Sequence, residues 1–300
     1  AAAHPPAARL KIDKGDTPRM KKNRPPCVAI LLLSSFFLAT VCPAAGLGDR
    51  PVTCEGRYPG HLQGVDWDRH QAIFWAFTSV LVKTDLDGAL VRKIDVPGHH
   101  GDLCFHRGRI YVAVNFGSFN DPEGNADNDV FVYDADSLEL LSRHDIPQVK
   151  HGAGGMTWQK GRFIVIGGLP EGYEENYFYE YDSDFRFLGR KVVQSGYSRL
   201  GIQAITSSGK LLWCGCYGNA LLRVTDDYQM TGRWEFDCGY GLIHVRGKRF
   251  MVTLGRFEEG VGYGGILRAA VSTDQGGLRP LREWLAPPAE RQRREKEGRR

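Results

Sequence analysis

The sequence predicts an all-β fold, a five-bladed β-propeller of four-stranded antiparallel blades, over residues 46–286. Three observations predict it. A pattern of short apolar strands and Gly-centred turns recurs five times between Pro59 and Trp284. Each copy has roughly 45 residues and room for four strands, which is the size of a propeller blade. Glycine and aromatic residues are abundant, with 37 glycines and 11% Phe, Trp and Tyr, as short strands joined by tight turns require.

Every copy begins with a Gly- or His-rich approach to a short apolar strand. A turn and a second strand follow, then a variable loop, a third strand and a final strand. Because one blade cannot bury both of its faces alone, neighbouring blades have to stack. The segment from Asp49 to Tyr58 is too short to form a sixth blade. The expected strands, each given with its turn, are as follows for the five copies in order: 60–68, 72–78, 80–88 and 90–97 in the first; 99–108, 109–117, 129–137 and 139–147 in the second; 151–161, 162–170, 177–185 and 188–194 in the third; 200–209, 210–218, 221–229 and 232–237 in the fourth; and 240–248, 249–257, 266–274 and 278–285 in the fifth.

An aspartate follows the third strand in four of the five copies. A carboxylate in this place can accept hydrogen bonds from the amides of its own turn. We therefore predict a structural and not a catalytic role for Asp85, Asp134, Asp182 and Asp226.

The two ends of the chain differ in composition from the repeats. Basic residues at 21–24 precede an apolar run at 27–41, which predicts a signal peptide over residues 20–45 and a secreted or periplasmic protein, not a membrane-spanning one. Lipidation at Cys42 is disfavoured because Val41, and not a small residue, precedes it. Residues 1–19 are expected to be disordered or to precede the true start, and residues 287–300 to form a charged disordered tail.

The net charge of +4 comes mainly from the ends. The repeat region is close to neutral and has no basic stripe, so nucleic acid is excluded as a partner. A monomer is expected. Cys54 precedes the first copy and Cys238 the last, and export permits a disulfide between them. Cys214 and Cys216 lie on one face of a strand and are expected to be buried.

Polar residues gather in the loops before the first strands, and these loops reach the same face as those between second and third strands. His61, His99 and His151 stand at nearly equivalent positions in three consecutive copies. Neutral imidazoles suit a divalent transition metal, although they could equally hydrogen-bond the Gly-rich backbone at the channel rim. In an enzyme, His100 or Asp102 would be the general base and Glu174 or Glu175 the acid. The expected ligand-binding residues are Gln63, Asn176, Tyr197, Arg199 and Gln203.

A long acidic loop follows the second strand of the second copy. Its oxygen-bearing side chains recur at every second residue, which is typical of calcium loops, but Gly124 is misplaced for an EF-hand and no Glu closes the motif. Calcium and a merely solvated loop both remain open here. The candidate calcium ligands are Asp121, Glu123, Asn125 and Asp127.

The stretch VFVYDADSLELL, and in weaker form residues 59–284, resembles the secreted bacterial propeller repeats of the NHL, YVTN and glutaminyl-cyclase-like kind. This resemblance implies the fold and brings no catalytic motif with it. The sequence also lacks GxSxG, phosphate-loop and HExxH motifs. Carboxylates, tyrosines and amides on one face favour a small polar ligand, above all a carbohydrate. The alternatives are a non-catalytic scaffold that binds a protein or cell-wall partner, and a weak contact made by the charged tail.

Overall fold

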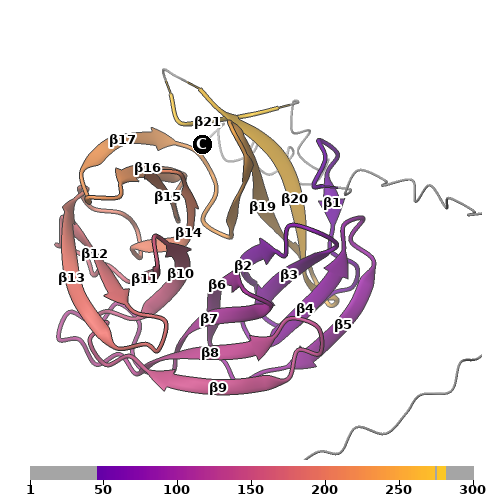
Figure 1. Ribbon diagram of the computed structural model, residues 1–300, viewed down its shortest axis with the longest axis horizontal. Coiled ribbons are helices and arrows are strands. Elements are labelled where there is room, and N and C mark those ends of the chain that lie inside the picture. The colour runs from indigo at the N-terminus through magenta and orange to yellow at the C-terminus, as the bar shows by residue number, and fades with distance from the viewer. Residues whose placement is uncertain (1–45, 274–275, 282–300) are drawn as a thin grey trace, which may run out of the picture. The chain divides into compact units, whose positions relative to one another are not determined.

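The computed structural model describes residues 46–273 and 276–281, and over this range it is a five-bladed β-propeller (Figure 1). The predicted extension at 1–19, the signal peptide at 20–45 and the tail at 287–300 lie outside the described residues. The described part contains strands and turns, and it holds no helix long and apolar enough to cross a membrane.

Four blades are continuous in sequence, and each is an antiparallel sheet in chain order from the channel outward. Blade 1 holds β2 (Leu62–Trp67), β3 (Ala72–Phe77), β4 (Val80–Asp85) and β5 (Leu90–Asp95). Blade 2 holds β6 (His100–His106), β7 (Arg109–Asn115), β8 (Asn128–Asp134) and β9 (Leu140–Asp145). Blade 3 holds β10 (Ala153–Gln159), β11 (Arg162–Gly167), β12 (Glu175–Tyr181) and β13 (Phe187–Gln194). Blade 4 holds β14 (Ile202–Ser208), β15 (Leu211–Cys216), β16 (Ala220–Thr225) and β17 (Met230–Glu235).

Blade 5 is completed from both ends of the described chain. Its inner strands are β18 (Leu242–Arg246), β19 (Arg249–Glu258) and β20 (Gly262–Ser272), and its outer position is shared by β1 (Val52–Thr53) and β21 (Leu278–Pro280). Thr53 lies opposite Ile266, and Pro280 lies opposite Ala270. The segment that was too short for a sixth blade therefore closes the ring by pairing with the last blade.

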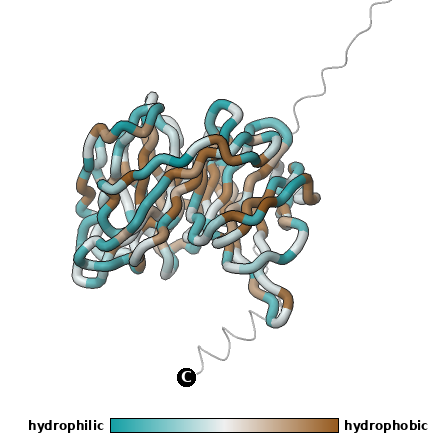
Figure 2. Tube along the Cα trace, turned by 90° about the horizontal axis from the view of Figure 1, so that it is seen from below, coloured by the Kyte–Doolittle hydropathy of each residue, from teal (hydrophilic) through white to brown (hydrophobic). Residues whose placement is uncertain are grey.

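The core consists of layers between adjacent blades. In β3, Trp75 packs toward blade 5 while Phe74 packs toward blade 2, because successive side chains of a strand point to opposite faces. Both faces of the inner strands are thus buried, which is why these strands are apolar almost throughout. Figure 2 shows hydrophobic segments running through the middle of the propeller and hydrophilic segments along much of its edge.

Three of the four predicted turn aspartates have the expected role. The Asp85 carboxylate accepts hydrogen bonds from the Asp87 and Ala89 amides, both at 2.9 Å, and Asp134 and Asp182 do the same in their turns. In blade 4 the hydroxyl of Thr225 takes this place by accepting from the Gln229 amide at 2.9 Å. Asp226 instead forms an ion pair with Lys160 of blade 3.

The predicted Cys54–Cys238 disulfide is wrong, because both cysteines are free and buried. Cys54 packs between blades 5 and 1, and its amide donates to the Gly265 carbonyl at 2.9 Å. Cys238 packs in the separate layer between blades 4 and 5. Cys214 and Cys216 are fully buried, as predicted.

Candidate functional site

The innermost strands open onto a pocket at each end of the central channel. Gln63, Gly101, Gly154 and Gln203, near the starts of β2, β6, β10 and β14, line the N-end pocket, which encloses about 220 Å³. Val65, Leu103, Thr157 and Ile205, farther along the same strands, line the C-end pocket. The predicted site corresponds to the N-end pocket.

A bulge at the start of each of these four strands aims residues at the channel. The register shifts between Leu62 and Gly64, between His100 and Leu103, between Ala153 and Gly155, and between Ile202 and Ala204. The residues left without a partner on the neighbouring strand include Gln63, Asp102 and Gln203. A bulge re-aims the side chain of such an extra residue. A side chain at either glycine of these bulges would collide with the next blade. A Cβ on Gly101 would lie 2.5 Å from the Gly154 carbonyl oxygen, and one on Gly154 would lie 2.9 Å from the Ile202 carbonyl oxygen.

Two histidines and one amide form the centre of the N-end pocket. The Gln63 Nε2 lies 2.9 Å from the Nε2 of His61 and 3.0 Å from the Nε2 of His99, and the two imidazole centroids are 6.0 Å apart. If the Gln63 amide donates to both rings, each ring carries its own proton on Nδ1. The Tyr217 hydroxyl, 3.3 Å from the His61 Nε2 and 3.4 Å from the Gln63 Oε1, adds blade 4 to this network.

Both imidazoles are uncharged near neutral pH. Burial lowers the pKa of His61, and the neighbouring His99 lowers it further. Removal of solvent also lowers the pKa of His99, although this ring stands at the exposed rim. Asn115, Gln203 and Tyr217 also line the pocket, and among its described lining residues there is no Asp, Glu, Lys or Arg. The pocket is therefore polar but neutral.

Sequence reasoning missed Asn115, Phe119, Leu200 and Tyr217, which also line this pocket. Tyr217 follows β15, in the short loop between the second and third strands of blade 4. The rule that such loops reach this face would have found it. Phe119 lies in the long acidic loop of blade 2, where only the acidic side chains follow a recognisable pattern.

The two proposed general bases are structural groups. His100 is fully buried, with its Nδ1 2.7 Å from the Pro97 carbonyl and its Nε2 2.7 Å from the Tyr133 hydroxyl. Burial lowers its pKa to about 4. Asp102 is 1% exposed, and its carboxylate accepts hydrogen bonds from the Val65 amide of blade 1 at 3.1 Å and from the Ile205 amide of blade 4 at 3.0 Å. Asp102 thus bridges the channel between the two pockets.

The proposed acids and several ligand residues lie away from both pockets. Glu174 accepts from the Tyr197 amide at 3.0 Å, and Glu175 accepts from the Tyr177 hydroxyl and the Gln194 amide group. Asn176 is buried and donates to the hydroxyls of Ser195 and Ser198. Tyr197 and Arg199 follow β13 and do not line either pocket.

His151 is not beside the other two predicted metal ligands. Its Nδ1 lies 2.8 Å from the Asp121 carbonyl, its ring packs on Tyr173 and Tyr177, and its Nε2 is buried without a hydrogen bond among the described residues. Across the part of the chain that the structure describes, no three His, Cys, Asp or Glu side chains are placed to hold a metal ion. His61 and His99 form a pair only.

The candidate calcium loop does not gather its carboxylates. Asp121 accepts hydrogen bonds from the Glu123 amide at 2.9 Å and from the Asn125 side chain at 2.7 Å, while the Asp127 amide donates to Asn115. These contacts hold the loop against the blade in the manner of an Asx turn. Nothing in this arrangement adds support to the calcium prediction.

No protein-family model matches the chain, and no curated protein matches it. Among solved structures it is similar to glutaminyl cyclase from Myxococcus xanthus, with a TM-score of 0.52 and 11% identity over 75% of this chain and 96% of that one. BamB from Moraxella catarrhalis matches with a TM-score of 0.37 and 11% identity, over 69% of this chain and 58% of its own. The computationally designed Ika4 protein gives 0.36 and 12%, over 63% and 99%. At such identities the likeness shows the fold alone.

Proposed function

We propose that this propeller binds a small uncharged polar molecule, with carbohydrate as the favoured class, in the N-end pocket. One observation carries the proposal: two neutral imidazoles converge on the Gln63 amide inside a pocket whose described lining residues include no Asp, Glu, Lys or Arg. A sugar hydroxyl both donates and accepts hydrogen bonds, so it matches histidine nitrogens, amides and a phenol together. The rings of Phe119 and Tyr217 add the apolar surface on which a sugar face can pack.

Binding is better supported than glycoside hydrolysis. Hydrolysis by the usual route needs two carboxyl groups that flank the glycosidic bond. The carboxylates expected for that role, Glu174 and Glu175, accept hydrogen bonds from their own blade, and Asp102 is sealed between strands. The proposed function is therefore recognition of the ligand, and its transformation is not part of the proposal.

Isothermal titration calorimetry with a panel of neutral mono- and disaccharides tests the proposal. We expect at least one sugar to bind, and His99→Ala to weaken that binding about tenfold, because one good hydrogen bond is lost. The matched control is His70→Ala, since His70 is exposed in the β2–β3 turn and outside both pockets. If no sugar binds, or if both variants weaken binding equally, the proposal is wrong.

A divalent metal is a second occupant for the same pair of histidines. The Gln63 amide could be turned so that its oxygen faces the two rings, and a site of two imidazoles and one oxygen would result. Elemental analysis checks this. About one equivalent of a transition metal per chain, lost in the His61→Ala/His99→Ala double variant, would support it. A chain that stays metal-free after incubation with zinc would rule out a metal as the occupant of this histidine pair.

The rival function is a scaffold that binds a protein or a cell-wall polymer. It is favoured by apolar pairs that begin the outermost strands of three consecutive blades: Leu90–Val91, Leu140–Leu141 and Phe187–Leu188, each residue 40% to 57% exposed. Repeated apolar pairs on the rim suit an extended partner. Such binding would not depend on the N-end pocket, so His99→Ala would leave it unchanged.

A further inference from the structure

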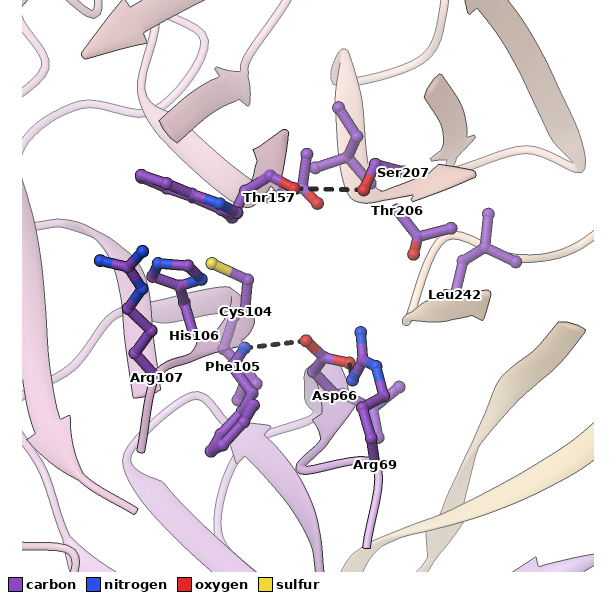
Figure 3. Close-up of a pocket in the computed structure, with 14 residues that line it drawn as sticks. Asp66, Arg69, Cys104, Phe105, His106, Arg107, Thr157, Thr206, Ser207 and Leu242 are labelled. Carbon is purple, nitrogen blue, oxygen red and sulfur yellow. Dashed lines mark hydrogen bonds and ion pairs between the residues drawn. The ribbon is translucent and has the colours of Figure 1, made fainter. Parts of the chain in front are cut away.

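The C-end pocket is a separate cavity to which all five blades contribute. It encloses about 290 Å³, the size at which pockets for small molecules begin. Figure 3 shows Arg107 and His106 on one side of this cavity, Asp66 with Arg69 on another, and Thr157, Thr206 and Ser207 facing them. Asp102 lies between Gly101, which lines the N-end pocket, and Leu103, which lines this one, so the two cavities are independent.

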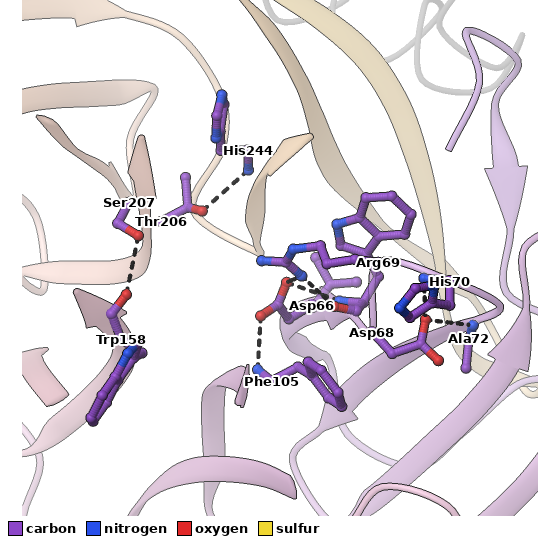
Figure 4. A network of polar contacts seen from close by, with 12 residues as sticks. Asp66, Asp68, Arg69, His70, Ala72, Phe105, Trp158, Thr206, Ser207 and His244 are labelled. Carbon is purple, nitrogen blue, oxygen red and sulfur yellow. Dashed lines mark hydrogen bonds and ion pairs between the residues drawn. The ribbon is translucent and has the colours of Figure 1, made fainter. Parts of the chain in front are cut away.

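The only carboxylate lining the C-end pocket among the described residues is already occupied. The Asp66 Oδ1 accepts from the Trp67 amide at 2.9 Å and pairs with Arg69 at 2.8 Å. Its Oδ2 accepts from the Phe105 amide at 2.8 Å, and Figure 4 shows these contacts around one buried side chain. Asp66 therefore organises the wall of the pocket and offers no free acceptor to a ligand.

Arg107 gives the pocket an unbalanced positive charge. No ion pair or hydrogen bond of its guanidinium joins another residue in the part of the chain that the structure describes. Arg107 and Gly108 form the turn between β6 and β7 with φ of 49° and 75°. Two successive positive φ values are typical of a type I′ hairpin turn, which fixes the place of Arg107 at the rim.

Two hydroxyls of the wall are free to donate hydrogen bonds, while the third, that of Ser207, already donates to the Trp158 carbonyl at 3.2 Å. The Thr206 hydroxyl accepts from the His244 amide at 3.1 Å, so its own proton is free to donate. The Thr157 hydroxyl has no hydrogen bond to another described residue, although the side chain is only 6% exposed and lines the cavity. The His106 ring stacks on Trp158 at 4.0 Å between centroids, and this stacking holds its nitrogens beside Arg107.

The geometry points to a binding site for a small oxyanion, either a phosphate or a carboxylate group, in the C-end pocket. A cation without a partner, two free hydroxyl donors and a neutralised carboxylate suit a ligand with negative charge and several acceptor oxygens. Guanidinium groups form the strongest hydrogen bonds with such oxygens. This site differs from the N-end pocket in charge, in residues and in the ligand it selects.

Isothermal titration calorimetry on the full chain tests the site, with inorganic phosphate and acetate as separate probes at constant ionic strength set by sodium chloride. We expect saturable binding of one equivalent of phosphate, of acetate or of both. Binding of phosphate alone would indicate that the natural ligand carries a phosphoryl group. Binding of acetate, alone or together with phosphate, would indicate that a carboxylate is accepted. Arg107→Asn should weaken binding about tenfold. Asparagine tolerates positive φ, so this change removes the charge and keeps the turn. Thr157→Val should weaken binding severalfold.

Arg246→Asn is the matched control. Arg246 is exposed at the end of β18, in the corresponding hairpin of blade 5, and outside the pocket. It carries the same charge change on the same face, and binding should stay within about twofold of the wild type. Three results would overturn the inference: neither anion binds more tightly than chloride, Arg107→Asn has no effect, or both arginine variants weaken binding equally.

Discussion

Replacing Asp102 by Ala is expected to lower the free energy of unfolding by roughly 3–5 kcal/mol, the largest effect of any single change considered for this protein. The Asp102 carboxylate is the acceptor for the buried amides of Val65 and Ile205, which belong to blades 1 and 4. Each amide left without an acceptor costs about 1–3 kcal/mol, and the lost side chain also leaves a cavity. Urea denaturation followed by circular dichroism measures the change.

Two further variants test whether the loss of stability comes from the hydrogen bonds that the Asp102 side chain accepts. Asp102→Asn keeps the shape but turns one acceptor oxygen into a donor, so it should lose an intermediate amount. Asp95→Ala, at an exposed position on β5, should change the free energy of unfolding by less than about 0.5 kcal/mol. A loss of less than about 1 kcal/mol in Asp102→Ala would show that the channel does not depend on this carboxylate.

The second large effect is a loss of stability in mild acid. Burial lowers the pKa of His100 in the folded state to about 4, against 6.5 in the unfolded chain. Between these values the unfolded chain binds the proton and the folded chain does not. The contribution is therefore complete above pH 6.5 and is lost as the pH falls toward 4, by roughly 3 kcal/mol. The pKa values of His61, His151 and His244 are lowered as well and act in the same direction. Burial raises the pKa of Asp102, which acts in the opposite direction, so the comparison with a His100 variant isolates the histidine.

The free energy of unfolding, measured by urea denaturation at pH 7, 5.5 and 4.5, checks this. His100→Phe should be less stable than the wild type at pH 7, because the Pro97 and Tyr133 partners are lost, and it should also show a flatter pH dependence. A pH dependence in His100→Phe as steep as that of the wild type would contradict the assignment.

The fold could be predicted because repetition and alternation are local properties of the sequence. Each blade carries the same order of apolar strands and turns, and stacking follows from burial. The closure of the ring could not be predicted, since β1 has only two residues, Val52–Thr53, and carries no strand pattern of its own. Its strand character comes from pairing with β20, which is a contact between distant parts of the chain.

The residues of the candidate site could be predicted only where they occupy equivalent positions in the repeat. His61 and His99 precede equivalent strands, and equivalence in a repeat places them together. His151 stands one residue earlier, two before Ala153 at the start of β10, and its Nδ1 hydrogen-bonds to the Asp121 carbonyl of the acidic loop instead. The bulges that aim Gln63 and Gln203 at the channel, and that bury Asp102 within it, each shift the register by one residue, which a sequence pattern does not reveal.

Nuclear magnetic resonance of the histidine rings, recorded at pH 7 with and without the best-binding sugar, tests the central proposal most directly. We expect His61 and His99 to be neutral, with protons on Nδ1, and to be the histidines whose signals shift when the sugar binds. The signals of His106 and His244, on the opposite side of Asp102, should stay in place. A charged His61 or His99, or a sugar that shifts His106 and leaves His99 unmoved, would contradict the N-end pocket as a site for a neutral polar ligand.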